Sequence, residues 1–292
     1  MGQEEPQSFK LAPAARSLDF YEVKAEDAIP DSARELLTSY ARIPANEVND
    51  HVDAIRKKAF SIAPYPCIGM YRFLDLGLCK SPVYQEVLQR IMNGEQFLDL
   101  GCCFGQETRQ LINDGAPAEN LHGSDLVQAF IDLGYDLFGD RNGEGKKISW
   151  HVANIFDDTD PAWEDLRGRL SIVYTGSFFH LFDWDEQVAV AKRIVTLLKP
   201  EPDVLLVGRQ IGSISAGEFE RAQGGDNKRR YRHNPQSWKE LWEKVGEATG
   251  TKWDVQAEFD PKGVGLGEGR AKLNELGVGE EARRLRFVVR RV

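Results

Sequence analysis

The stretch FLDLGCCFG, residues 97–105, decides how the rest of the chain is interpreted. It reads as a short apolar strand that carries an acid, Asp99, followed by a turn and the start of a helix. Glycine is needed where the backbone takes a positive φ or where a ligand presses against the chain, and Gly101 and Gly105 supply two such positions. A pyrophosphate-binding turn, G-x-G-x-x-G, needs another glycine where Cys103 stands. The turn therefore favours a nucleoside without phosphates, such as S-adenosylmethionine (SAM).

A second acid follows at the distance expected of a ribose-binding residue. Asp125 lies in the strand-like string LHGSDL, residues 121–126, twenty residues after Gly105. In doubly wound sheets, an acid about twenty residues past the glycines binds the ribose hydroxyls. The alternative is that Asp125 caps a helix starting near Val127, because aspartate is a favoured N-cap. The spacing from the glycine turn favours ribose binding.

Helical and strand-like patterns alternate from residue 81 onward, which is typical of a parallel α/β sheet. Strands are expected at residues 97–100, 121–126, 148–153, 170–175 and 204–207, and helices from residue 106 and at 127–138, 185–198 and 237–246. Ser81-Pro82 predicts the start of a further helix and Gly94 its end. Strand-like runs at residues 252–259 and 285–292 predict an antiparallel hairpin at the edge of a seven-stranded sheet.

Two regions do not fit the sheet. Residues 1–80 hold helical patterns at 32–42 and 46–60, and residues 209–234 form a long insertion rich in glycine and charge. Connections this long are usually lids, binding loops or disordered segments. We expect residues 1–80 to form a helical cap, residues 81–292 the nucleoside-binding domain, and the insertion a cover over the substrate. A mobile tail and a loose loop are the alternative.

Composition narrows the functional classes. The chain has 292 residues, a net charge of −9 and four cysteines. An acidic chain is a poor partner for nucleic acid, which basic surfaces usually bind. The cysteines form no C-x-x-C pair, so we expect no metal site and a reducing, cytoplasmic location. Neither a signal-like start nor a run of 18 apolar residues is present, so no membrane span is expected.

The residues that follow the third strand suit an adenine ring. Ile155 and Phe156 are apolar, a backbone amide could read the ring, and Asn154 could accept a hydrogen bond from the exocyclic amine. An ordinary strand end with two core residues is the alternative.

The loop after the fourth strand opens where a reactive sulfonium would lie. His180 stands in it, and imidazole titrates near neutral pH, so it could take a proton from an acceptor hydroxyl. A buried, hydrogen-bonded histidine is the competing interpretation. A basic run at residues 228–233 includes Arg230, Arg232 and His233. Such runs are usually solvated surface, but one that folds inward would suit a carboxylate, which arginine binds bidentately.

Several longer strings resemble a known family. They are residues 70–76 with 97–105, NLHGSDLVQAFIDLGYDLFGDR (120–141), FFHLFDWDEQ (178–187), GRQIG (208–212) and YRHNPQSWKELWEKVGEATG (231–250). These strings, across roughly residues 50–260, are similar to those of the fungal class I SAM-dependent methyltransferases of meroterpenoid and polyketide gene clusters. Residues 260–282 do not align with that pattern.

The resemblance implies a Rossmann-like sheet, SAM as methyl donor, S-adenosyl-L-homocysteine as product, and a homodimer. It also implies a small hydrophobic natural product as acceptor, often methylated at a carboxyl group. By position, the family's cofactor contacts fall on Asp125 with Leu126, and on Asn154, Ile155 and Phe156.

We therefore expect direct displacement at the methyl carbon by a carboxylate oxygen of the acceptor. Asp99 would orient the methionine end of SAM, Gly101 and Gly105 would admit it, and Asp125 would hold the ribose. Methylation of a phenol, an alcohol or a carbon shares every cofactor residue and stays open, as does a catalytically silent SAM-binding relative that regulates a pathway. A nicotinamide oxidoreductase is disfavoured by Cys103.

Overall fold

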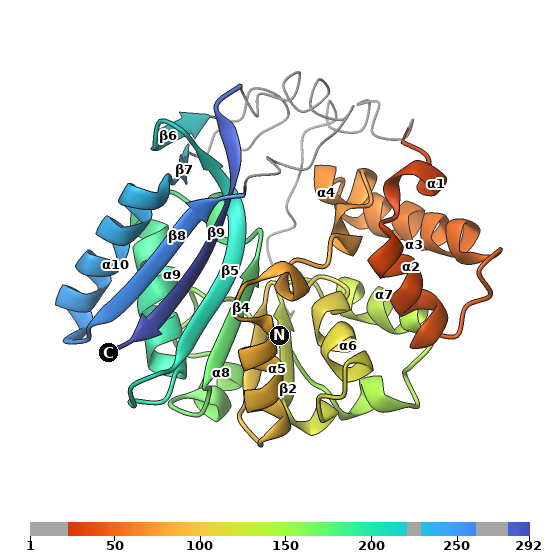
Figure 1. Cartoon of the computed structure of the whole chain (residues 1–292), viewed down its shortest axis with the longest axis horizontal. Helices are drawn as coiled ribbons and strands as arrows, with labels where there is room; N and C mark the ends of the chain where they lie inside the picture. The colour runs from red at the N-terminus through yellow and green to blue at the C-terminus, as the bar shows by residue number, and fades with distance from the viewer. Residues whose placement is uncertain (1–22, 221–228, 261–279) are drawn as a thin grey trace, which may run out of the picture.

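The computed structural model describes residues 23–220, 229–260 and 280–292. Their main feature is a seven-stranded sheet in the order β3-β2-β1-β4-β5-β9-β8 (Figure 1). Its strands are β1 (Phe97–Leu100), β2 (Leu121–Asp125), β3 (Ser149–Val152), β4 (Ile172–Gly176), β5 (Leu205–Ser213), β8 (Trp253–Phe259) and β9 (Ala282–Arg291). Neighbours from β3 to β5 pair in parallel, whereas β9 is antiparallel to both β5 and β8. The predicted parallel sheet with an antiparallel edge hairpin is confirmed.

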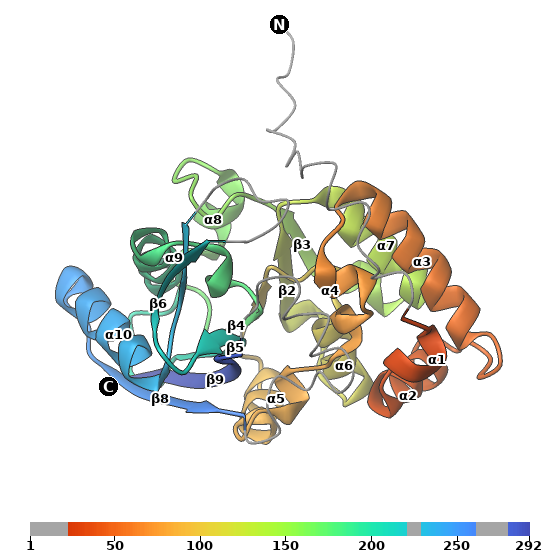
Figure 2. The same ribbon diagram turned by 90° about the horizontal axis from the view of Figure 1, so that it is seen from above.

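Helices cover both faces of the sheet (Figure 2). One face carries α8 (Pro161–Leu166), α9 (Trp184–Leu197) and α10 (Pro235–Thr249), and the other carries α5 (Tyr84–Met92) and α6 (Gln106–Asn113). The remaining elements from β1 onward are η5 (Ala118–Asn120), α7 (Gln128–Phe138), η6 (Glu144–Lys147), η7 (Phe179–Leu181), β6 (Gly217–Glu220) and β7 (Arg229–Arg232). Within the described ranges, every helix is too short or too polar to cross a membrane.

The central strands are apolar on both sides because both sides are covered. In β1, Phe97 packs into the core beneath α5 and α6, while the next residue, Leu98, packs into the core beneath α9 and α10. Successive side chains of a strand point to opposite faces, so a strand covered twice reads as a continuous apolar run. The acid of the FLDLGCCFG stretch, Asp99, is the polar exception in this run.

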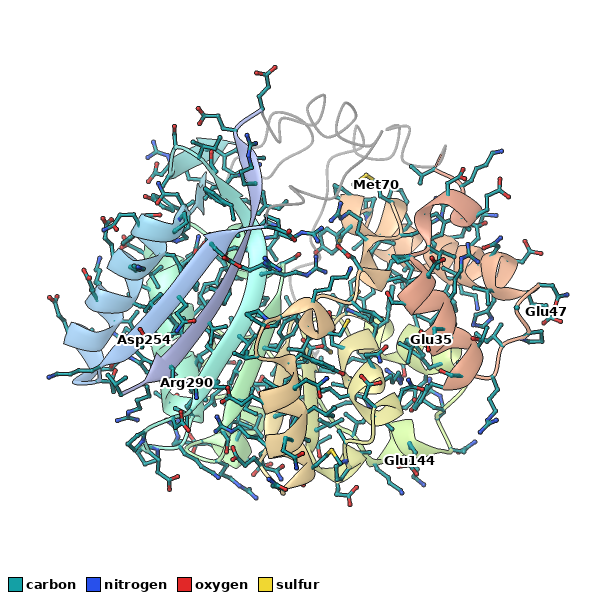
Figure 3. The ribbon with its side chains drawn as sticks, viewed as in Figure 1. Glu35, Glu47, Met70, Glu144, Asp254 and Arg290 are labelled. Atoms are coloured by element: carbon teal, nitrogen blue, oxygen red, sulfur yellow. The ribbon has the colours of Figure 1, made fainter. Side chains whose placement is uncertain are left out.

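The N-terminal segment is α1 (Ala25–Ala28), α2 (Asp31–Ser39), α3 (Val48–Ile62), α4 (Pro66–Gly69), η3 (Arg72–Leu74) and η4 (Leu78–Lys80). Its helices pack on α6 and α7, and they share one apolar core with Phe104 and Phe130. Met70 lies at the end of the molecule where β1 to β5 finish, and Arg290 lies toward the opposite end (Figure 3). The segment therefore reaches the edge of the sheet where ligands bind in open α/β folds.

A buried ion pair joins this segment to the sheet domain. The fully buried guanidinium of Arg109, in α6, donates to both carboxylate oxygens of Asp140, just beyond α7, at 2.7 and 2.9 Å. The hydroxyl of Tyr40, which follows α2, donates to the same carboxylate at 2.8 Å. Three elements are thus held at one point.

Two boundaries differ from the sequence predictions. Ser81 and Pro82 form a turn, and α5 begins only at Tyr84, whose N–H donates to the Ser81 carbonyl. The fifth strand continues to Ser213 instead of ending near Val207, because nine of its residues pair with β9. The predicted insertion at residues 209–234 is therefore wrong in part, because residues 209–213 belong to β5.

The rest of that insertion also contains regular structure. Strands β6 and β7 pair antiparallel in a small hairpin beyond β5. Residues 221–228 of the expected insertion lie outside the described residues, as do residues 1–22 of the expected cap.

Candidate functional site

The turn after β1 is left-handed at three positions. The φ angles are +78° at Gly101, +53° at Cys103 and +64° at Gly105. A Cβ added to Gly101 would stand 2.6 Å from the ring of Phe178, and one added to Gly105 would collide with Trp150. Both glycines are thus required by backbone geometry and by packing against side chains of the protein itself. Their expected role of admitting a ligand stays a prediction.

Cys103 connects this turn to the second acid. Its N–H donates to Oδ2 of Asp125 at 2.9 Å, and the other carboxylate oxygen, Oδ1, accepts from the N–H of Val127 at 3.0 Å. The N-cap of α7 is Val127 and has no side-chain hydrogen bond, so Asp125 is not the helix cap. The backbone of Leu126 also contributes a hydrogen bond to this carboxylate. A carboxylate has about four lone-pair sites, so capacity remains for a further donor such as a ribose hydroxyl.

Burial raises the pKa of Asp125, although its backbone hydrogen bonds oppose that shift. Donors from a ligand would stabilise the charged carboxylate further. Leu126, the next residue, is 45% exposed despite its large apolar side chain. It offers a flat apolar contact beside the acid.

Asp99 is the most constrained acid of the site. Its side chain is 2% exposed, and Oδ2 has no hydrogen-bond partner among the residues that the structure describes. Burial, followed by the charges of Glu107 and Asp125, raises the pKa of Asp99 well above its ordinary value. A cation beside it would relieve both the burial and the repulsion. Asp99 therefore fits the ammonium group of a bound amino acid such as the methionine part of SAM.

Glu107 was not singled out from the sequence. It lies in the first turn of α6 and is 3% exposed, and its carboxylate accepts from the N–H groups of Gly77 and Leu78 at 2.6 and 3.2 Å. Glutamate at this position reads as an ordinary helix-start residue, so no local signal marks its role. It holds the N-terminal segment against the glycine turn.

The residues after β3 include one buried and one exposed apolar side chain. Oδ1 of Asn154 accepts from the N–H of Phe156 at 3.0 Å, so that backbone amide is already bonded. Ile155 is buried, while Phe156 is 41% exposed and contacts Phe182 edge to face with the ring centroids 5.2 Å apart. Together with Leu126, Phe156 offers the apolar surface that an adenine ring needs.

The loop after β4 carries His180. Ser177 takes a left-handed φ of +62°, and its N–H donates to the carbonyl of Arg209 at 2.7 Å. A non-glycine residue in this region is strained, and such strain is concentrated at functional sites. His180 follows in η7 and is partly buried. The loop is packed against the hairpin β6–β7, because the N–H of Tyr231 donates to the carbonyl of Phe182.

The three basic residues predicted to bind the acceptor do not act as one group. Nε of Arg230 donates to the carbonyl of Leu181 at 3.2 Å, which brings its guanidinium beside η7. Arg232 is 8% exposed and stacks on Phe219, with its guanidinium carbon 3.2 Å from the ring centroid. Burial lowers the pKa of Arg232 to about 9.

The expectation that His233 contacts the acceptor is wrong. Its side chain is fully buried, and its ring nitrogens are hydrogen-bonded to Ser237 at 2.9 Å and to Gln187 at 3.1 Å. Burial lowers the pKa of His233 to about 3, so the ring is neutral. The basic run therefore separates in the fold, because Arg230 is bonded to η7, whereas His233, just beyond the end of β7, is bonded to α9 and α10.

This chain is similar to a known family model and to several named proteins. Residues 20–74 match a family model described as the meroterpenoid methyltransferase N-terminal domain. O-methyltransferase phiE, from a fungal species, is 39% identical to this chain and is covered over 98% of its own length and 100% of this chain. The asnovolin E/chermesin D methyltransferase nvfJ of Aspergillus novofumigatus is 42% identical, over 79% of this chain and 81% of that protein. O-methyltransferase atr3 of Stereocaulon alpinum is 40% identical, over 87% and 72%.

Proposed function

Because the chain belongs to the SAM-dependent methyltransferases of fungal secondary metabolism, we propose that it methylates a carboxylate oxygen of a small, hydrophobic natural product. The single observation that supports a carboxylate is Arg230, whose side chain is bonded to η7, in the loop that follows β4. A carboxylic acid with a pKa of about 4 is ionised at neutral pH, so the enzyme needs to orient it and does not need to deprotonate it.

The residues of the site fit the cofactor of this family. Asp99 would hold the ammonium group, and Asp125 would accept from a ribose hydroxyl through its remaining lone-pair capacity. Leu126 and Phe156 would contact the adenine ring. When bound, SAM supplies a methyl group that its sulfonium charge has already activated.

The remaining task of the protein is alignment. Holding two reactants in line can contribute roughly 7–11 kcal/mol to the barrier reduction. The strained backbone at Ser177 and the packing of η7 on the hairpin would hold the loop in position beside the reacting groups. Arg230 would orient the carboxylate there, and His180 would position the acceptor.

A hydroxyl acceptor is the second candidate, and the location of His180 in η7 favours it. A phenol with a pKa near 10 would need a base, and imidazole is suited to that role. A silent relative is less well supported, because Asp99 and Asp125 are both kept in binding geometry.

We also propose that the segment 1–80 caps the acceptor. Its described helices share a core with α7, and the segment reaches the ligand-binding edge of the sheet. A homodimer is proposed from the family resemblance alone, and light scattering of the purified protein tests it.

Titration with S-adenosylhomocysteine tests the cofactor site. We expect micromolar binding by the wild type and a loss of at least tenfold in Asp125→Ala, because the charge-assisted hydrogen bonds to ribose are removed. A panel of meroterpenoid and polyketide carboxylic acids, each paired with the corresponding alcohol, tests the acceptor. Turnover of acids alone, retained in His180→Ala, supports a carboxylate. Loss of turnover in His180→Ala with unchanged S-adenosylhomocysteine affinity would instead indicate proton abstraction.

A further inference from the structure

Four buried side chains share an unusual property. Ser124, Asp99, Thr175 and Gln210 are each at most 2% exposed, and each has a polar atom without a hydrogen-bond partner in the part of the chain that the structure describes. A buried polar group without a partner costs about 1–3 kcal/mol, so native proteins keep few of them. A group of such side chains at one edge of a sheet marks a place where a ligand supplies the partners.

These side chains lie one to a strand. Ser124, Asp99 and Thr175 each occupy the penultimate position of β2, β1 and β4, and Gln210 lies in β5. The sheet order is β2-β1-β4-β5, so all four residues stand at the edge where these strands end. Asp99 pairs with Gly123 and Tyr174, so its side chain points to the opposite face of the sheet from those of Ser124 and Thr175, which form a row with Gln210. The proposed cofactor contacts, Asp125 and Asp99, are on β2 and β1. Gln210 stands at the other end of the row.

The strand register places Gln210 beyond the end of β4. The last residue of β4, Gly176, pairs with Arg209, so Gln210 has no partner residue on that strand. Thr175 pairs with Gly208, two positions before Gln210, so the Thr175 and Gln210 side chains point to the same face of the sheet. The chain that leaves β4 on its way to η7 starts at this point.

We propose that Gln210 binds the carboxyl group of the acceptor and so determines acceptor specificity. Its Nε2 donates to the carboxylate oxygen that does not attack the methyl group, and the Thr175 hydroxyl is a second donor on the same face. The inference rests on the proposed methylation of a carboxylate and adds a residue that recognises it. Gln210 appears in the sequence only as the centre of GRQIG, where nothing shows which face of a strand it occupies.

A second buried glutamine in the same protein is a matched control. Gln187 in α9 is fully buried, like Gln210, but its amide is fully used. Its Nε2 donates to the carbonyls of Phe182 and Tyr231 at 3.1 and 2.9 Å, and its Oε1 lies 3.1 Å from Nε2 of His233. A leucine at position 187 would remove the bonds to the Tyr231 carbonyl and the His233 ring, and would leave the Phe182 carbonyl with only the N–H of Tyr231, whereas a leucine at position 210 would remove two unpaired atoms.

The experiment compares Gln210→Leu and Gln187→Leu with the wild type, without ligand and then with ligand. Without ligand, we expect Gln210→Leu to raise the melting temperature by about 2 °C or more and Gln187→Leu to lower it. Affinity for S-adenosylhomocysteine should stay within twofold in Gln210→Leu. The KM for the acid that the panel identifies should rise by about tenfold to a hundredfold, because a site built to bind a polar group loses its donor. A lower melting temperature in Gln210→Leu, or an unchanged KM, would overturn the inference.

The variant Gln210→Glu distinguishes a failure of this inference from a failure of the proposed function. A carboxylate at position 210 repels an acceptor carboxylate but can accept from an acceptor hydroxyl, so we expect it to abolish turnover of acids. If acids are methylated and Gln210→Glu leaves their KM unchanged, the role of Gln210 is refuted while the proposed function stands. If only hydroxyl acceptors are methylated, the carboxylate assignment is refuted in both proposals.

Discussion

The carboxylate of Asp99 shows how one residue combines stability and function. It is buried beside two other acids, and its Oδ2 has no partner in the described ranges, so its charge is a cost until a cation arrives. The sequence was sufficient to single out Asp99 and Asp125, because both acids stand at strand ends with a recognisable spacing from the glycines. Thr175 and Gln210 carry no such signal, since their importance depends on which face of the strand they occupy.

Replacing Asp99 tests whether this residue lowers stability and at the same time contributes to ligand binding. Because the pKa of Asp99 is raised on folding, the folded state binds its proton more tightly than the unfolded chain does, and stability is lost as pH rises above about 4. We expect Asp99→Asn to be more stable than the wild type by an amount that grows from pH 4 to pH 7, as measured by urea unfolding. Its affinity for S-adenosylhomocysteine should fall by about tenfold or more. A stability difference that does not depend on pH would contradict this account.

The helices of the N-terminal segment depend on contacts outside themselves. Arg109 and Tyr40 both donate to Asp140, so α2, α6 and the end of α7 meet at one carboxylate. The sequence indicates two of these helices from their periodicity, and α2 and α3 are close to the predicted ranges. It does not reveal the shared ion pair, because the partners are 31 and 100 positions apart.

Breaking that junction should destabilise the fold strongly. We expect Asp140→Ala to lower the free energy of unfolding by about 3–5 kcal/mol, because it leaves the buried guanidinium of Arg109 without its counter-charge. The control is Asp132→Ala, which removes the exposed pair of Asp132 with Arg141 and should cost less than about 1 kcal/mol. Denaturant unfolding measures both, and equal losses in the two variants would rule out a special role for the junction.

The architecture of the whole molecule was easier to predict than its details. Alternating periodicity and the glycine turn indicated a mostly parallel sheet with an antiparallel edge hairpin, because these depend on local patterns. The length of β5 was underestimated, since residues 209–213 read as charged and glycine-rich, and only pairing with β9 makes them a strand. His233 was misassigned for the same reason, because its burial results from packing against α9 and α10.

Two neutral histidines reduce the stability of the fold at acid pH. Burial, helped by His151, lowers the pKa of His122 to about 4, and burial lowers that of His233 to about 3. The unfolded chain binds these protons below about pH 6.5, so each histidine reduces stability by up to about 1.4 kcal/mol per pH unit as pH falls further. We expect the stability of the wild type relative to His122→Asn to shrink between pH 6.5 and pH 5 in urea unfolding. A constant difference over that range would argue against a neutral His122.

The apolar core shared by the N-terminal helices and α7 limits how such an enzyme can be diversified. Phe104 lies within the glycine turn and Phe130 lies in α7, shortly after Asp125, yet both pack against the N-terminal segment. In a chimera that took only its first 80 residues from a relative, the two sides of this apolar core would come from different proteins. Their side chains would not be matched in packing. We therefore expect new acceptors to be reached more easily by point changes at Gln210 and in the small hairpin, because these positions are outside the apolar cores.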